Sequence, residues 1–243
     1  MKYDLSILVC ALDERKDTFL KNLLSILEPQ VRHKNVELLI LSDDATMNIG
    51  AKRNKAIAES SGKYFAFVDD DDRVAEDYVD SILAAIQQDA DVIVFDAEIR
   101  FDGGLPIRVR YSTEHKHEHR DNTYWRQPNH LMAHKRSNVS LPFQDVRWGE
   151  DTDWAEERMH DIKTQTKIDK VLYYYDYSST TEKHQGPNFV LTKRTRSTTT
   201  TLPPTTTTTC PPYGTFLCVG TDVYYADGCC GKELSHINHA SCY

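Results

Sequence analysis

The chain has 243 residues, of which 40% are hydrophobic and 27% are charged, which is typical of a globular protein with one α/β domain and a small appendage. Its formal net charge of -8 argues against binding to a nucleic-acid backbone, which requires a basic surface. No apolar stretch approaches the ~18–20 residues of a membrane span. The N-terminus leads into a predicted strand without a leader, so we expect a cytoplasmic protein without a transmembrane segment.

Predicted strands and helices alternate along the first half of the chain. Strands are expected at residues 5–9, 36–41, 65–68 and 91–95, and helices at about 18–28, 49–59 and 75–88. The first helix is expected to start at a cap formed by Asp17 or Thr18 and to end before Pro29. Residues 100–138 are irregular, and a helix within 148–160 and a strand at 171–175 follow. This order predicts an α/β fold with a mostly parallel sheet and helices on both faces.

Four consecutive aspartates, Asp69 to Asp72, directly follow the apolar run 65–68. In an open α/β sheet, ligands bind beyond the carboxyl ends of the strands, where these aspartates are expected. Adjacent carboxylates repel one another, so a bound cation is a physical reason to keep them, and hard oxygen ligands suit Mg²⁺ or Mn²⁺. Asp70 is then a candidate donor-side residue. The alternative is a solvated acidic turn in which Asp72 caps the next helix.

Two other predicted strand ends bring polar residues to the same edge of the sheet. Asp13 and Arg15 follow the first strand, and Asp43 and Asp44 follow the second. An aspartate at a strand end can accept a hydrogen bond from a nucleotide base or a ribose hydroxyl. These four residues are therefore candidates for binding a nucleotide.

A basic pair, Lys52 and Arg53, lies early in the second predicted helix. The pair can neutralise phosphate charge, or it can lie on a solvated helix face. No Gly-x-Gly-x-x-Gly or Walker sequence is present, which disfavours a dinucleotide site and a P-loop ATP site.

A second acidic pair, Glu150 and Asp151, follows Gly149 and lies between Trp148 and Trp154. Acidic residues at a helix start are favoured by the helix dipole, so capping alone can explain the pair. The aromatic flanks and the two acids also suit a general base held against a sugar ring. Glu150 and Asp151 are therefore candidate catalytic residues.

These motifs together resemble those of family-2 inverting glycosyltransferases of the GT-A fold. The resemblance covers roughly residues 3–180 and lies in the order of Asp43-Asp44, Lys52-Arg53-Asn54, the strand-end aspartates 69–72 and Gly149-Glu150-Asp151. The stretch from Pro128-Asn129-His130 to Pro142-Phe143 is also similar to the acceptor side of such enzymes.

The resemblance implies a GT-A-like, Rossmann-type fold and a hexosyltransferase-like enzyme. Such an enzyme transfers a sugar from a nucleotide-diphosphate sugar, first of all a UDP-sugar, to a hydroxyl of a glycan, protein or small molecule, with inversion. It implies Mn²⁺ or Mg²⁺ on Asp69 and Asp71, of which Asp71 fits either register of the Asp-x-Asp pattern. It also implies Asp43 or Asp44 near the nucleotide base and Asp151 as the general base.

Two alternative functions share the same predicted sheet. A sugar-1-phosphate nucleotidyltransferase also uses a metal-binding carboxylate, but it usually has a glycine-rich basic loop after the first strand, and residues 10–15 contain no glycine. A non-catalytic carbohydrate-binding, virion or surface protein is the other alternative. Metal-dependent hydrolysis of a nucleotide sugar distinguishes an enzyme from a binding protein.

The C-terminal part of the chain differs in composition. Residues 197–209 form a Thr/Pro-rich segment, predicted to be a linker, between a domain at 1–196 and a module at 210–243. The module has five cysteines, which predicts that disulfides or a metal ion cross-link it. Cys10 is expected instead to be a small buried hydrophobic residue. The module resembles short modules of phage structural and surface proteins, which leaves a virion, a surface or the cytoplasm of an infected host cell open as locations.

Four histidines are further candidates. His115, His117 and His119 alternate, so a strand places them on one face, and both a metal site and a solvated segment remain open. His184, after the last predicted strand, is a candidate metal or phosphate ligand.

Overall fold

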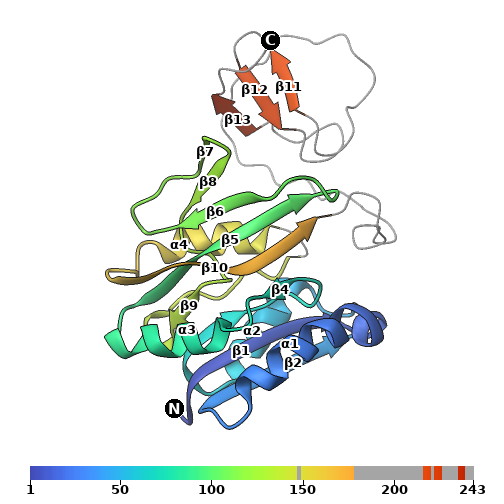
Figure 1. Cartoon of the computed structure of the whole chain (residues 1–243), viewed down its shortest axis with the longest axis vertical. Helices are drawn as coiled ribbons and strands as arrows, with labels where there is room; N and C mark the ends of the chain where they lie inside the picture. The colour runs from blue at the N-terminus through green and yellow to red at the C-terminus, as the bar shows by residue number, and fades with distance from the viewer. Residues whose placement is uncertain (147–148, 178–215, 220–221, 226–234, 239–243) are drawn as a thin grey trace. The chain divides into compact units, whose positions relative to one another are not determined.

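The computed structural model divides the chain into two compact units, Met1–Asn188 and Phe189–Tyr243 (Figure 1). It describes residues 1–146, 149–177, 216–219, 222–225 and 235–238. The predicted linker at 197–209, four of the five C-terminal cysteines, Trp148 and His184 lie outside the described residues, so the predictions for them stay predictions.

One sheet of ten strands forms the centre of the first unit. Its strands are β1 (Tyr3–Leu12), β2 (Val36–Asp43), β3 (Gly62–Phe67), β4 (Arg73–Val74), β5 (Val92–Phe101), β6 (Ile107–Tyr111), β7 (Glu118–Arg120), β8 (Thr123–Arg126), β9 (Ala133–Lys135) and β10 (Gln165–Tyr177). The order is β2-β1-β3-β9-β5-β6-β8-β7, and β10 pairs with β5 and β4. The α-helices are α1 (Lys21–Val31), α2 (Ile49–Glu59), α3 (Tyr78–Ala85) and α4 (Glu150–Arg158).

The long strands of this sheet share one direction. β1 runs parallel to β2 and β3, and β5 runs parallel to β10. β9 is antiparallel to both β3 and β5, so these two also point the same way. The mostly parallel α/β sheet expected from the sequence is therefore confirmed, and the carboxyl ends of β1, β2 and β3 meet at one edge, where ligands bind in such sheets.

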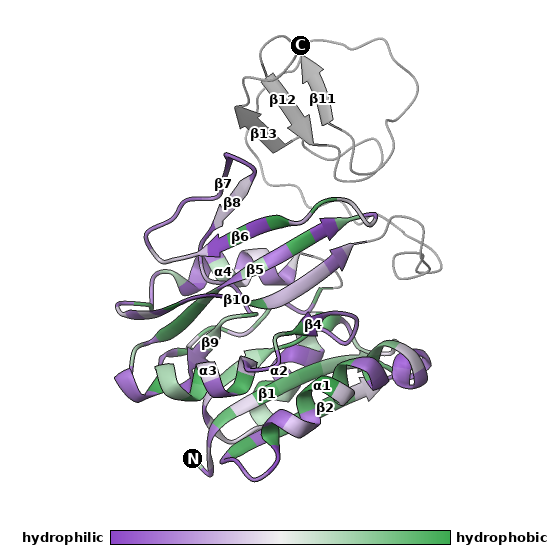
Figure 2. Cartoon of the chain, viewed as in Figure 1, coloured by the Kyte–Doolittle hydropathy of each residue, from purple (hydrophilic) through white to green (hydrophobic). Residues whose placement is uncertain are grey.

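Alternating side chains of β1 separate two apolar layers. Leu5, Ile7 and Val9 belong to a core that also contains residues of α1 and α3, namely Leu23, Leu27, Val79 and Ile82. Leu8 and Cys10 belong to the opposite layer, with Ala56 of α2, Trp154 of α4 and the ring of Phe143. Helices therefore cover both faces, as predicted, and β1 and β5 carry long hydrophobic stretches whereas β7 is hydrophilic (Figure 2).

Cys10 is buried in this second layer, as the sequence predicted. Burial raises the pKa of its thiol to about 12, and the nearby Arg53 opposes the shift without cancelling it. The thiol is therefore neutral and packs as a small apolar side chain.

Helix α1 differs from its prediction at both ends. A π-helical turn at Lys16–Leu20 precedes it, and Thr18 donates its hydroxyl to the Arg15 carbonyl instead of capping the helix. The helix continues past Pro29 to Val31. The reason is tertiary, because the side chain of the buried Gln30 donates to the carbonyl of Ala75 and accepts from the amide of Val79, which holds the last turn in place.

Helix α2 has the predicted bounds, but α3 begins at Tyr78, three residues after the predicted start. The amide of Ala75 donates instead to the carbonyl of Leu172 in β10, next to the two-residue strand β4. Strand pairing therefore competes with the start of the helix.

The segment 100–138, which the sequence left irregular, supplies four strands. β6 pairs antiparallel with β5, and β8 pairs parallel with β6 and antiparallel with β7. β9, inserted between β3 and β5, is three residues long and has no independent sequence signal. These strands depend on partners that the chain reaches only in the folded state.

The described part of the second unit is a three-stranded antiparallel sheet with the order β11-β12-β13. Its strands are β11 (Phe216–Val219), β12 (Asp222–Tyr225) and β13 (Ser235–Asn238). Among the described residues of the whole chain, no helix combines the length and the apolar character needed to cross a membrane.

Gly50, in the first turn of α2, lets this helix approach the segment that precedes α4. A Cβ atom at this position would lie 1.8 Å from the carbonyl oxygen of Gln144 and 3.5 Å from the Cβ of Glu150. The close approach brings the first turns of α2 and α4 together, and the candidate site residues of both helices lie there.

We predict that Gly50→Ala lowers the free energy of unfolding by about 1–3 kcal/mol, because the added methyl group meets backbone that cannot move aside cheaply. Helix propensity alone would give the opposite sign. Urea unfolding measures the change, and Ala58→Gly on the exposed face of the same helix is the control, with an expected loss of about 0.5–1 kcal/mol. A stabilised Gly50→Ala protein would contradict the close contact.

Candidate functional site

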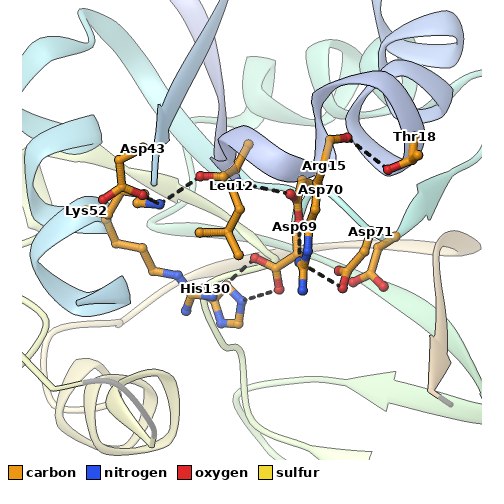
Figure 3. Close-up of polar contacts among 12 residues, drawn as sticks. Leu12, Arg15, Thr18, Asp43, Lys52, Asp69, Asp70, Asp71 and His130 are labelled. Atoms are coloured by element: carbon orange, nitrogen blue, oxygen red, sulfur yellow. Dashed lines mark hydrogen bonds and ion pairs between the residues drawn. The ribbon is translucent and has the colours of Figure 1, made fainter. Parts of the chain in front are cut away.

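The ends of β1 and β2 and the aspartates after β3 are joined by hydrogen bonds (Figure 3). The amide of Leu12 donates to Oδ2 of Asp70 at 3.3 Å. Lys52 donates from Nζ to the carbonyl oxygen of Ala11 at 2.7 Å and also pairs with Asp43. The three strand ends therefore form one polar edge, as the sequence predicted from their order.

Arg15 lies over the middle of the aspartate run. Its Nη1 is 2.9 Å from Oδ1 of Asp70 and 3.3 Å from Oδ2 of Asp71. Burial raises the pKa of Asp70, and Arg15 opposes that shift. Arg15 thus brings one guanidinium to two adjacent carboxylates, which reduces their mutual repulsion.

Arg53 is a buried guanidinium that joins two elements of the site. Its Nη2 lies 3.2 Å from Asp69, and its Nη1 lies 3.0 Å from Glu150 of α4. The rings of Phe67 and Phe143 lie 5.6 Å from the guanidinium carbon, within the range of cation–π attraction. The solvated helix face that was the alternative for Lys52 and Arg53 is therefore wrong, since both side chains are buried and paired.

Asp69 is the most exposed of the aspartates that contact these cations, with 31% of its side chain accessible. Desolvation would raise its pKa, but Arg53 and His130 outweigh that effect and hold the pKa well below the usual range. Asp69 is therefore ionised near neutral pH, in a position where part of its carboxylate faces solvent.

Asp72, unlike Asp69, is held by a hydrogen bond inside the fold. Its Oδ2 accepts a hydrogen bond of 2.7 Å from the hydroxyl of Tyr173 in β10, and the same hydroxyl accepts from the amide of Asp69 at 3.1 Å. Asp72 is buried and does not cap α3, which begins six residues later without a side-chain cap. The capping alternative for Asp72 is therefore wrong.

The remaining candidates from the first two strand ends differ in exposure. Asp43 accepts from the amide of Met47 at 2.7 Å in addition to its pair with Lys52, so it organises the turn before α2. Asp13 is exposed and lies 2.8 Å from Lys16, and Asp44 is also exposed. Asp13 and Asp44 are therefore placed where an incoming ligand can reach them.

Glu150 and Asp151 start α4 and have opposite environments. Glu150 has 5% of its side chain exposed, and burial raises its pKa to about 7 against the opposing effect of Arg53. Asp151 has 38% of its side chain exposed, with Oδ1 accepting from the amide of Thr152 at 2.9 Å. Gly149 precedes them in a left-handed conformation with φ of 81°, which favours glycine.

The aromatic flank expected at Trp154 is absent from the site. This side chain is buried, stacks on Phe143 with ring centroids 4.5 Å apart, and donates its indole N–H to the carbonyl of Leu141. Trp154 is therefore a core residue that anchors α4 and does not face a sugar ring.

His130 is a site residue that the sequence placed only in a general acceptor-side stretch. Its Nε2 lies 3.6 Å from Asp69 (Figure 3). Its Nδ1 lies 3.9 Å from Asp151, so the ring lies between two candidates. No spacing in the sequence marks His130 as a site residue, because its contacts depend on how the loop between β8 and β9 folds back onto the site.

The histidines of the β6–β8 region do not gather around one point. The ring of His115 meets Trp125 edge-on at 4.8 Å, whereas His119 stacks on Tyr124 at 4.4 Å. Tyr124 and Trp125 are neighbours in a strand and point to opposite faces. Across the described residues, no group of three or more His, Cys, Asp or Glu side chains is arranged to hold a metal ion by itself.

Comparisons with known proteins agree with this architecture. Residues 45–143 match the family model described as Glycosyl transferase family 2. The crystal structure of S. aureus TarS 1-349 superimposes with a TM-score of 0.52 at 16% identity, over 71% of this chain and 60% of TarS 1-349. The complex of TarS 1-349 with UDP-GlcNAc gives a TM-score of 0.54 at 14% identity, over 77% of this chain and 62% of the other.

The chain thus spans about 60% of the length of the TarS 1-349 structures that it matches. No curated protein matches it significantly. The similarities confirm the predicted fold, a mostly parallel α/β sheet with helices like that of the GT-A structures it matches.

Glu150→Gln tests the electrostatics of this site. Because the folded pKa of about 7 lies above the ordinary value of 4.5, protonation of Glu150 stabilises the fold fully below pH 4.5, and this stabilisation is lost as the pH rises through 7. Between about pH 5 and pH 8, the wild-type protein should lose more unfolding free energy than Glu150→Gln, by about 1.4 kcal/mol for each unit of the shift.

The measurement is urea unfolding of both proteins at a series of pH values, and Glu157→Gln on the exposed side of α4 is the matched control. Parallel pH profiles for the wild type and Glu150→Gln would contradict the raised pKa.

Proposed function

We propose that this protein transfers a sugar from a nucleotide-diphosphate sugar to an acceptor hydroxyl, with inversion at the anomeric carbon. The family-2 match at 45–143 and the GT-A fold support the reaction class. The observation that carries the proposal is the separation of roles at one sheet edge. Arg15 and the buried Arg53 pair with the inner carboxylates of Asp70, Asp71 and Glu150, whereas Asp69 and Asp151 keep 31% and 38% of their side chains exposed.

The donor side is proposed to lie over the ends of β1 and β2. Asp43 or Asp44 is suited to accept hydrogen bonds from the base or ribose, and Asp13 and Arg15 lie beside the same edge. Since TarS 1-349 has been crystallised with UDP-GlcNAc and with UDP, a UDP-sugar is the donor to test first. The acceptor is a hydroxyl of a glycan, a protein or a small molecule.

Asp69 and Asp71 are the residues proposed to hold Mn²⁺ or Mg²⁺. Their chemistry fits, because both ions prefer carboxylate oxygens and bind through one or two of them together with phosphates. Arg15 and Arg53 contact four carboxyl groups at this edge, namely Asp69, Asp70, Asp71 and Glu150. A bound divalent ion would offset negative charge on the leaving diphosphate.

Asp151 is proposed to be the general base. Its carboxylate takes the proton of the acceptor hydroxyl as the oxygen bonds to the anomeric carbon, on the face opposite to the diphosphate. The bond from that carbon to the diphosphate oxygen breaks, and the nucleoside diphosphate leaves. One displacement inverts the anomeric centre without a covalent enzyme intermediate. Glu150 serves this step indirectly, because its pair with Arg53 fixes the first turn of α4.

Asp151→Asn is expected to lower turnover by roughly 10²-fold or more, because an amide cannot accept the proton and base catalysis contributes on that scale. Donor binding should change little. Transfer from UDP-GlcNAc and other UDP-sugars measures turnover, and the nucleotide-induced shift in melting temperature measures donor binding.

Asp153→Asn is the matched control, because Asp153 lies in the same first turn of α4 and shares the helix dipole. A helix cap at 151 would instead give a stability loss of about 1 kcal/mol with near-normal turnover. That outcome would remove Asp151 from the reaction.

Asp71→Asn is expected to abolish Mn²⁺-dependent transfer while the protein stays folded, since the substitution removes a ligand and also a repulsive charge. Calorimetric titration with Mn²⁺ in the presence of UDP should show weaker binding than in the wild type. Asp80→Asn, at a surface carboxylate paired with Lys34, should keep both properties. Full activity of Asp71→Asn in EDTA would contradict the assignment of Asp71 as a metal ligand.

Metal-dependent hydrolysis or transfer by the wild type also separates an enzyme from a carbohydrate-binding protein with the same fold. Binding of UDP-sugars without any turnover, across donors and both metals, would favour the binding protein.

A further inference from the structure

His130 is held rigidly between the two sides of the proposed site. It lies in the loop between β8 and β9, and its carbonyl oxygen accepts a hydrogen bond of 3.2 Å from the amide of Phe67 at the end of β3. Its ring packs near the ring of Phe67, with centroids 6.3 Å apart, and 5% of the side chain is exposed. Backbone bonding and packing therefore fix where the imidazole points.

Both ring nitrogens of His130 are buried and have no hydrogen-bond partner within the described part of the chain. Each nevertheless faces a carboxylate oxygen, Nε2 that of Asp69 at 3.6 Å and Nδ1 that of Asp151 at 3.9 Å. These distances exceed those of a hydrogen bond by less than about 1 Å. Buried polar groups normally find partners, and catalytic hydrogen bonds that are long in a ligand-free protein shorten in the complex.

The two carboxylates differ in how they are held. Arg53 already pairs with Asp69, whereas the other contact seen for the Asp151 carboxylate is the amide of Thr152, its neighbour in the chain. A hydrogen bond donated by Nδ1 would fix the orientation of the exposed Asp151 carboxylate, and the donor would lie on the side of the site where the strand-end aspartates are. Rigid placement of a base matters, because a displacement of about 1 Å can cost roughly 10²-fold in rate.

We propose that His130 is a positioning residue for the base, which orients the Asp151 carboxylate by donating a hydrogen bond from Nδ1. The inference rests on the proposed function. It adds a physical link between the aspartate that faces the donor and the aspartate that faces the acceptor. Nε2 and Asp69 hold one end of the ring, and Nδ1 holds the base at the other.

The test compares His130→Phe with His130→Gln and with a matched control. Phenylalanine keeps a ring and removes both nitrogens, whereas the glutamine amide can still donate. His134→Phe is the control, because His134 is also a buried histidine, bonded at 2.8 Å to the carbonyl of Asn129, and packs against Trp154 away from the carboxylates.

His130→Phe should lower kcat by roughly 10- to 10²-fold with donor KM changed less than about threefold, and His130→Gln should recover about tenfold of that loss. His134→Phe should lower the melting temperature but should not lower kcat selectively relative to KM. An unchanged kcat in His130→Phe overturns the proposal. The proposal is also overturned if His134→Phe lowers kcat as much as His130→Phe does, or if His130→Gln restores none of the lost kcat.

A second measurement does not depend on turnover or on the fold of a variant. Nitrogen-15 NMR of histidine-labelled wild-type protein with UDP and Mg²⁺ should show a proton on Nδ1 of His130. An unprotonated Nδ1 in that complex overturns the proposal. A wild type that binds UDP but transfers no sugar refutes the proposed function instead, and the NMR result still decides whether Nδ1 carries the proton that a hydrogen bond to Asp151 requires.

Discussion

The site depends on the buried guanidinium of Arg53. Without it, Asp69 and Glu150 would face each other across the junction of α2 and α4 with uncompensated charge, and burial of an unpaired carboxylate is costly. Arg53 can lie there because Gly50, one turn earlier, lets α2 approach the chain before α4. Two rings, of Phe67 and Phe143, complete its surroundings, so apolar packing and charge pairing support the same geometry.

This arrangement divides similar residues into different roles. Asp70 and Asp72 are buried and bonded to Arg15 and to Tyr173, whereas Asp69 keeps exposed oxygen in the same run of four. The same division separates Glu150, whose pKa burial raises to about 7, from its neighbour Asp151. The exposed carboxylates are open to solvent, and the buried ones hold the edge together.

Part of the fold and the site was predictable because local signals agreed with tertiary structure. The apolar runs at 5–9, 36–41, 65–68 and 91–95 became long strands of one direction, and α2 has its predicted bounds. Other elements were not predictable. β9 is three residues long and lies between two strands it joins only on folding, and Gln30 holds α1 past Pro29 through contacts with distant backbone. Trp154 looked like an aromatic neighbour of the site but stacks in the core.

The sequence by itself determined the fold class and the edge of the sheet where polar residues collect, because strand order and strand direction follow from alternating patterns and short connections. Tertiary structure alone decided which charged groups pair. Lys52 and Arg53 are adjacent, yet one joins Asp43 and the other joins Asp69 and Glu150. It also placed His130 between Asp69 and Asp151. Such contacts depend on distances between segments far apart in the chain, which no local pattern encodes.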